Sequence, residues 1–411
     1  MNSAEHKPQV RFKGFTDPWE QRKFGELLNE TREKTTVEDE DTLLSCAIDG
    51  MFLNSELFSH FRGSSNIGYL KVKKNDLILS AQNLHLGNCN VNLRFEHGII
   101  SPAYKVYELI NCNPLFMQAW VKQDKTKDFF LKASTEGASV CRKNIVWEEL
   151  YKQELPVPEI DEQEKIGKFF QNLDNLITLH QRKCEAIKKY KKCMLQKMFP
   201  QNGEVVPKLR FPGFPDDWEQ RKLGEVLSFQ NGFNGGRKAF GEGLPLISVM
   251  DILNNQFISY DVIRGKATVT DDEYERYAVR YGDVLFQRSS ENVEDAGSTN
   301  VYIDTDKIAI FGGFVIRGKQ IYPYRPKFMK YLLDTKNVRN QITKKAQGAQ
   351  HVNVSQETLQ DVMITLPSES EQLRIETCLY NLDNLITLHQ RKCDVLKELK
   401  QGLLQQMFVS E

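Results

Sequence analysis

The sequence lacks the spaced residues that most enzymes use for chemistry. It has no G-x-x-x-x-G-K-[ST] phosphate loop, no G-x-S-x-G nucleophile turn and no H-E-x-x-H zinc motif. The glycine cluster at 232–237 is followed by neither a Lys-Ser/Thr pair nor an apolar helix. The eight cysteines form no CxxC pair, which favours free thiols over zinc or disulfides. We therefore expect no catalytic residue, metal or cofactor on this chain.

One segment imitates a catalytic motif. Asn113-Pro114-Leu115-Phe116 resembles the N-P-P-[FY] loop of adenine methyltransferases but lacks its second proline. The matching place later in the chain reads Arg325-Pro326-Lys327-Phe328, where the asparagine is also missing. Asn as N-cap with Pro in the first turn is typical of a helix start. No glycine-rich S-adenosylmethionine signature accompanies the segment, so the sequence predicts a helix start here.

Polar and basic clusters are the side chains best suited to binding. Arg, Asn, Gln and Lys can read base edges in a major groove, while Lys, Ser and Thr can hold phosphates. Any one of these residues taken singly fits a solvated loop better than a binding site. As a set they favour binding, because they fall at matching places in the two copies of an internal repeat. The candidate DNA-binding residues are Gln82, Asn83, His85, Ser139, Arg142, Lys143, Asn234, Arg237, Lys238, Arg288, Ser289, Ser290, Lys344, Lys345, Gln347, Gln350 and His351. The run Lys188–Lys192 fits DNA or solvent equally well.

An internal repeat must position these residues. Residues 8–28 and 207–227 match at 14 of 21 positions, with an offset of 199. The segment NLDNLITLHQRKC occupies 172–184 and recurs unchanged at 381–393. The middle segments diverge, but Asp76–Leu79 lines up with Asp283–Phe286. The pattern predicts one mixed α/β fold in both middles, presenting two different surfaces on a common frame. Within the second middle, the residue types favour a short strand at Phe314–Ile316 and a helix from Pro326 to about Lys345.

Each copy ends in a long helix. From Phe170, apolar residues follow a 3-4-3-4 spacing, which is typical of a coiled coil. This apolar seam is interrupted at matching places in the two helices, by His180 and Lys191 in the first and by His389 and Lys400 in the second. A buried polar residue that fixes the register of the helices explains each histidine better than a metal site does. The predicted interface residues are Phe170, Leu173, Ile177, His180, Cys184, Ile187, Met194, Leu379, Leu382, Ile386, His389, Cys393, Leu396 and Leu403.

Pairing of the two long helices would bury the apolar face of each. A helix of about 36 residues is roughly 54 Å long. If a pseudo-two-fold axis perpendicular to the helices relates the copies, the helices run antiparallel and carry a globular head at each end. The expected fold is thus α+β: two mixed α/β domains joined by two long antiparallel helices that form a coiled coil, with an internal pseudo-two-fold repeat. Leu176, Leu179, Leu385 and Leu388 widen the apolar face, so a further partner could bind there.

Composition limits the class of protein. The 411 residues include 55 Lys plus Arg and 55 Asp plus Glu, so the formal net charge is zero and a uniformly basic polyanion binder is excluded. The start lacks the apolar core of a signal peptide, and no run of 18 apolar residues occurs. These features predict a cytoplasmic location.

Six segments of the repeated frame match a known pattern. They are Trp19–Glu26, Trp218–Glu225, Gly282–Leu285, Gly348–Pro367, Glu371-Gln372 and Met407-Phe408. With these segments the chain resembles the specificity subunits of type I restriction-modification systems. The resemblance covers nearly the whole chain, is closer in the second middle, and keeps Ile100–Tyr104 in the first.

The resemblance implies a non-catalytic subunit that reads a bipartite site in double-stranded DNA. Its domains would be target recognition domain 1 (1–157), spacer helix 1 (158–204), target recognition domain 2 (205–366) and spacer helix 2 (367–411). Two methyltransferase subunits would dock on it, and two restriction subunits would join them. S-adenosylmethionine, ATP and Mg²⁺ would be bound by those partners. The alternatives are a coiled-coil scaffold or adaptor protein and a stand-alone adenine methyltransferase.

Overall fold

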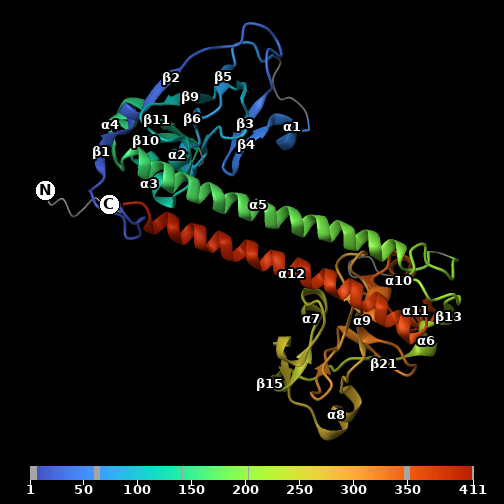
Figure 1. The fold of residues 1–411 in the computed structure, drawn as a ribbon. Coiled ribbons are helices and arrows are strands. Elements are labelled where there is room, and N and C mark those ends of the chain that lie inside the picture. The colour runs from blue at the N-terminus through green and yellow to red at the C-terminus, as the bar shows by residue number, and fades with distance from the viewer. Residues whose placement is uncertain (1–6, 60–64, 140–141, 202, 347–351, 410–411) are drawn as a thin grey trace. The chain divides into compact units, whose positions relative to one another are not determined.

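The chain forms two compact units. A computed structural model describes residues 7–59, 65–139, 142–201, 203–346 and 352–409. The first unit comprises Met1–Arg182 and Gln390–Glu411, and the second comprises Lys183–His389. Two helices of 38 residues, α5 (Ile160–Lys197) and α12 (Glu369–Gln406), each contribute one part to each unit (Figure 1). Among the described residues, no helix is both long and apolar enough to span a bilayer.

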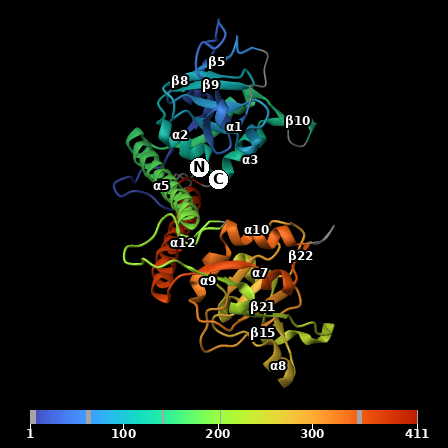
Figure 2. The same ribbon diagram turned by 90° about the vertical axis from the view of Figure 1, so that its right-hand side faces the viewer.

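A four-stranded antiparallel sheet lies at the centre of the first unit. Its strand order is β2 (Leu28–Thr31), β9 (Tyr104–Leu109), β6 (Leu77–Ser80) and β7 (Cys89–Val91). Side chains alternate between the faces of a strand, so Leu77 and Leu79 enter one core while Ile78 enters another. Helices α2 (Pro114–Val121) and α3 (Asp124–Lys132) lie on the side of this sheet that faces α5 (Figure 2).

Shorter pairs complete the first unit. The strand pairs are β1 (Glu20–Lys23) with β12 (Glu154–Val157), β3 (Leu44–Ala47) with β4 (Gly50–Leu53), β5 (Leu70–Lys73) with β8 (His97–Ile100), and β10 (Ser134–Ser139) with β11 (Arg142–Ile145). The remaining α-helices are α1 (Asn54–Leu57) and α4 (Trp147–Lys152).

The second unit repeats this plan. Its central sheet has the order β14 (Leu227–Asn231), β21 (Val315–Gln320), β17 (Val284–Gln287) and β19 (Thr299–Val301), all antiparallel. Val284 and Phe286 enter one core and Leu285 the other, as in the first unit. The prediction of one fold in both middles, and of an α+β class, is therefore confirmed.

Further elements surround the second sheet. The strands are β13 (Glu219–Lys222) with β23 (Met363–Leu366), β15 (Phe240–Ile247) with β16 (Lys266–Ala267) and β20 (Ile310–Phe311), and β18 (Ser289–Ser290) with β22 (Val352–Asn353). The helices are α6 (Leu223–Val226), α7 (Val249–Asn254), α8 (Asp271–Tyr277), α9 (Pro326–Leu333), α10 (Lys336–Lys345) and α11 (Gln356–Gln360).

Local signals in the sequence have mixed outcomes. The Asn113 side chain accepts hydrogen bonds from the backbone N–H groups of Leu115 and Phe116, so the predicted helix start is confirmed. The expectation of a single helix over 326–345 is wrong, because the chain breaks at Asp334 and Thr335 to form α9 and α10. Phe314, which we expected to begin a strand, lies instead in the turn before β21.

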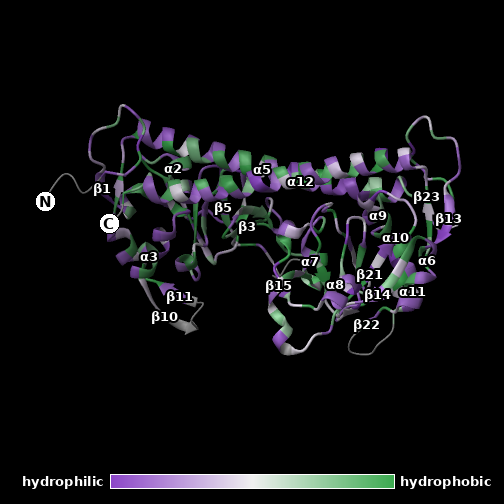
Figure 3. Cartoon of the chain, turned by 90° about the horizontal axis from the view of Figure 1, so that it is seen from below, coloured by the Kyte–Doolittle hydropathy of each residue, from purple (hydrophilic) through white to green (hydrophobic). Residues whose placement is uncertain are grey.

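The long helices pair antiparallel within each unit. In the first, Phe170 of α5 packs against Phe408, and Asp174 binds Lys400. In the second, the Cys184 Sγ lies 3.9 Å from the carbonyl oxygen of Ile386, and Lys191 binds Asp383. Residue numbers thus rise along α5 in the direction in which they fall along α12, so the two helices are antiparallel. Apolar and polar residues alternate along both helices (Figure 3). The predicted antiparallel coiled coil is confirmed.

The predicted seam residues all lie in the interior or at its margin. Seven of the fourteen are buried, the other seven are half-buried, and none is exposed. Buried are Phe170, Leu173, Ile177, Cys184, Met194, Leu379 and Cys393, and half-buried are His180, Ile187, Leu382, Ile386, His389, Leu396 and Leu403.

The two seam lysines form a duplicated ion pair. Lys191 Nζ lies 2.6 Å from Asp383 Oδ1 in the second unit, and Lys400 Nζ lies 2.6 Å from Asp174 Oδ1 in the first. Partly exposed ion pairs contribute about 1 kcal/mol or less, so their main effect is to select one register of the helices. Within the basic run, Lys191 is thus held by α12, whereas Lys188, Lys189 and Lys192 are exposed.

The repeated start motif holds the first turn of each long helix. Arg11 donates two hydrogen bonds of 2.7 Å to Glu162, whose side chain is fully buried, and Trp19 Nε1 donates a third at 3.2 Å. In the second unit, Arg210 donates two hydrogen bonds of 2.8 Å to Glu371. Breaking a buried pair of this kind costs about 3–5 kcal/mol, which explains why the motif recurs with the helix.

Candidate nucleic-acid interface

In the second unit, the candidate residues gather around one tight turn, Gly312-Gly313-Phe314, between β20 and β21. Val315 N donates to the carbonyl oxygen of Gly312 at 2.9 Å and closes the turn. Arg288, which follows β17, donates its backbone N–H to the carbonyl oxygen of Phe314 at 2.9 Å, and its Nη1 lies 3.4 Å from that of Gly313. The turn and Arg288 therefore form one hydrogen-bonded surface.

The glycine cluster packs against the same turn. The backbone N–H of Gly232 donates to Val315 O at 3.1 Å. A Cβ added at Gly232 would lie 2.0 Å from the carbonyl oxygen of Gly312, and one added at Gly313 would lie 1.8 Å from Asn234 Oδ1. Only glycine permits such close approaches, to a backbone at Gly232 and to a side chain at Gly313. The cluster thus brings the exposed Asn234 to the turn.

Other candidates of the second unit lie around this surface or beyond it. Ser289 pairs with Asn353 across β18 and β22, while Ser290 is buried. Lys238 and Lys344 are exposed, and Lys345 Nζ lies 3.8 Å from Asp361. The backbone of Arg237 begins a short 3-10 helix that ends at Ala239. Gln347, Gln350 and His351 lie outside the described residues.

The first unit repeats the hydrogen bonds of the turn with different side chains. Tyr104 N donates to Ser101 O at 3.1 Å, and Ala81 N donates to Ala103 O at 3.0 Å. Ala81 and Ala103 therefore stand where the second unit has Arg288 and Phe314. The two heads share a backbone frame at this edge and differ in what it presents.

The remaining candidates of the first unit also lie at this edge. Lys143 N donates to the carbonyl oxygen of Gln82 at 3.3 Å, which joins β11 to the loop after β6. Gln82 is exposed, and Asn83 and Lys143 are half-buried. Ser139 and Arg142 pair across β10 and β11, where the structure describes their backbone alone.

His85 does not present its ring at the surface. The residue is only 9% exposed, and neither ring nitrogen has a hydrogen-bond partner among the described residues. Burial, with a smaller contribution from the nearby Lys143 charge, lowers the pKa of the ring. The sequence pattern could not reveal this, because the packing of α3 against the loop is a tertiary contact.

Two carboxyl groups with a raised pKa lie in structural turns. Burial raises the pKa of Asp76 to about 6, and it also raises the pKa of Asp283 at the equivalent position. Asp76 Oδ2 accepts the backbone N–H of Lys73 at 2.7 Å, and Asp283 Oδ2 accepts that of Arg280 at 3.0 Å. Each carboxyl group thus closes the turn before a central strand, and its burial in that turn explains the raised pKa without a catalytic role.

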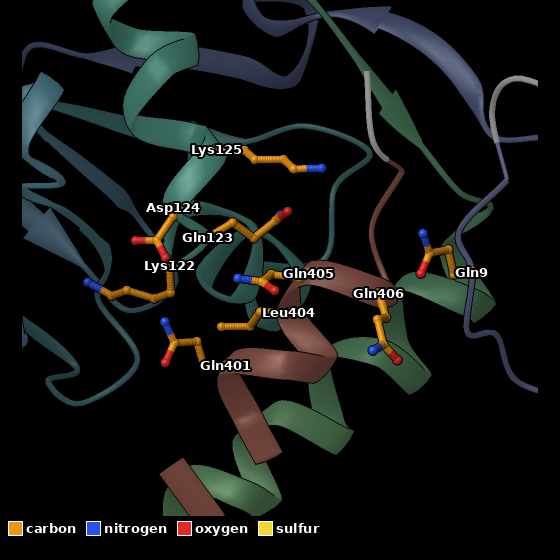
Figure 4. A pocket seen from close by; sticks show the side chains of 9 residues that line it. All are labelled: Gln9, Lys122, Gln123, Asp124, Lys125, Gln401, Leu404, Gln405 and Gln406. Atoms are coloured by element: carbon orange, nitrogen blue, oxygen red, sulfur yellow. The ribbon is translucent and has the colours of Figure 1, made fainter. Parts of the chain in front are cut away.

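A pocket in the first unit is lined mainly by amides. It lies between the junction of α2 with α3 and the end of α12 (Figure 4). Lys122 at its edge is held by the carbonyl oxygens of Ile48 at 2.6 Å and Cys89 at 3.1 Å. No group of three or more potential metal ligands was found among the described residues. The pocket is lined by Gln9, Lys122, Gln123, Asp124, Lys125, Gln401, Leu404, Gln405 and Gln406.

Comparison with known proteins identifies the class to which this fold and surface belong. The family model of the type I restriction modification DNA specificity domain matches residues 17–189 and again residues 215–398, one match for each copy. The chain belongs to this family.

Individual relatives agree with that assignment. The type I restriction enzyme MjaVIII specificity subunit of Methanocaldococcus jannaschii is 24% identical over 68% of this chain, which spans 66% of that protein's length. The putative MjaX specificity subunit of the same organism is 23% identical over 86% of this chain and 77% of its own length. The crystal structure of the type I restriction-modification S subunit from M. genitalium has a TM-score of 0.57 at 11% identity, covering 98% of this chain and 100% of that one. This structural likeness concerns the fold alone.

Proposed function

We propose that this chain is the DNA sequence-recognition subunit of a type I restriction-modification complex. The observation that carries the proposal is the equivalent turn of the two heads, where one backbone frame presents alanines in the first and Arg288 with Phe314 in the second. A duplicated frame with two different surfaces suits a bipartite site, in which each head reads its own half-site. The Arg288 guanidinium is suited to a guanine O6/N7 edge.

Catalysis belongs to other chains in this proposal. Two methyltransferase subunits supply S-adenosylmethionine chemistry, flipping the target base out of the duplex, and two restriction subunits supply ATP- and Mg²⁺-dependent cleavage. The exposed leucines of the long helices, Leu176, Leu179, Leu385 and Leu388, offer apolar surface for such partners. Zero net charge implies that partners provide much of the phosphate contact. The isolated chain should accordingly bind DNA weakly and the assembled methyltransferase tightly.

Arg288→Ala tests the proposal at the second half-site. In the assembled methyltransferase, the loss of a bidentate arginine contact should weaken specific binding by roughly 1–3 kcal/mol and relax the choice of one base. Binding to duplexes with single base changes, measured at fixed salt concentration, gives the readout.

Lys319→Ala is the matched control, because Lys319 is an exposed cation toward the other end of β21. Mapping of methylated adenines in DNA exposed to the complex defines the two half-sites. If the complex modified no bipartite sequence, or if Arg288→Ala left base selection unchanged, the assignment of this surface would be wrong.

A further inference from the structure

Phe314 is an exposed aromatic residue in the middle of the polar surface of the second head. With 71% of its area exposed, it exceeds every other large apolar side chain among the described residues. An exposed aromatic ring has an unfavourable contact with water that a stacking partner would remove.

The backbone that carries this ring is firmly held. The carbonyl oxygen of Phe314 accepts the N–H of Arg288, and Gly312 N donates to Ile247 O at 3.0 Å. The cluster around Gly232 packs against the other side of the turn. A ring presented by such a turn has little backbone freedom to lose on binding, which favours a tight contact.

The groups around the ring are suited to bases. Arg288 and Asn234 contact Gly313, the residue immediately before Phe314, and Ser289 follows Arg288. Arg and Asn donate to base edges, while an apolar ring stacks on base faces or enters a base step as a wedge. One turn therefore offers both kinds of contact that a DNA base can make.

We propose that Phe314 stacks on or between bases of the half-site read by the second head, acting as a wedge beside Arg288. The inference rests on the proposed DNA-reading function and adds how one half-site is held. The first head carries Ala103 at the equivalent position. Its half-site should therefore be read without a wedge.

The test uses the chain assembled with its methyltransferase subunits and duplexes that contain 2-aminopurine. The probe is placed at successive positions of either half-site other than the methylated adenine, so that base flipping does not contribute. The wild-type complex should raise fluorescence at a position in the second half-site and at none in the first. Phe314→Ala should abolish that rise and weaken specific binding roughly tenfold, since stacking on one base is worth about that factor.

Two comparisons distinguish a wedge from other roles. Phe314→Trp should keep the fluorescence rise, and the dependence of binding on salt should be the same for Phe314→Ala as for wild type, because no phosphate contact is lost. Tyr281→Ala serves as control, since Tyr281 is 47% exposed and precedes β17, whereas Arg288 follows it. Its binding should match wild type.

Three results would overturn the inference. Phe314→Ala with wild-type affinity and fluorescence would show that the ring does not touch bases. Reduced recovery of the methyltransferase complex with Phe314→Ala would instead assign the ring to a protein contact. An equal fluorescence rise in both half-sites would contradict the difference between Phe314 and Ala103. Failure of the wild-type complex to distinguish a bipartite site from random DNA would overturn the proposed function itself.

Discussion

At the scale of single residues, a buried carboxyl group occupies the same turn in both heads. Asp76 and Asp283 each accept a backbone N–H and precede a central strand, and burial raises the pKa of both. In the first head, where the pKa of Asp76 is about 6, the folded state binds the proton more tightly than the unfolded state does. A charged Asp76 therefore lowers the stability of the folded state, although its carboxylate group closes the turn.

This shift predicts a pH dependence of stability. The contribution of Asp76 is most favourable below its ordinary pKa near 4 and is lost as the pH rises through about 6. Asp76→Asn keeps an acceptor for Lys73 N without the charge. The variant should gain up to about 3 kcal/mol over wild type at pH 7.5 and little or nothing at pH 4. Urea unfolding of the full chain at both pH values measures the difference, and an equal difference at the two would contradict the assignment.

At the scale of elements, the coiled coil is specified by more than its apolar stripe. The sequence shows two lysines interrupting the seams at matching places, and the structure shows an aspartate of the other helix beside each. These aspartates lie at the same position of the identical segment NLDNLITLHQRKC, so the duplication of this segment supplied the acidic partner of both pairs. A slip of one helix against the other would leave all four charges without these partners.

Reversal of one pair tests this role. Asp174→Lys places two cations together at the seam of the first unit and should destabilise the chain by about 1 kcal/mol. Asp174→Lys combined with Lys400→Asp restores opposite charges and should recover most of that loss. The free energy of unfolding of the two single variants and the double variant forms a double-mutant cycle. A coupling energy of zero would mean that the pair has no part in helix pairing. The pair in the second unit is less suitable because Tyr331 OH also donates to Asp383.

At the scale of the whole molecule, the proposal makes the long helices a spacer between half-sites. Half-sites one turn of DNA apart are separated by roughly 34–36 Å, and a helix of 38 residues is about 57 Å long. The helices thus have the length to carry two reading heads at such a spacing. That arrangement remains a prediction.

Lengthening both helices by one heptad tests it. Seven residues inserted between Arg182 and Lys183, and again between Arg391 and Lys392, preserve the seam and add about 10.5 Å to each helix. The methylated site should keep both half-site sequences while its gap grows by up to about three base pairs. Mapping of methylated adenines measures this outcome. Insertion in one helix alone is the control and should abolish modification, because the two helices would then differ in length. An unchanged gap in the site methylated by the variant with both insertions would refute the spacer role.

The sequence by itself determined the frame of this protein. The repeat, the seam of each long helix and the Asn113 cap depend on residues close together in the chain or at a regular period, so their pattern is visible without coordinates. Only the tertiary structure decided what the frame presents. It buried His85, placed Phe314 in a turn rather than a strand, and brought Asn234 and Arg288 to that turn. These outcomes depend on contacts between segments far apart in sequence, whose packing no local period encodes.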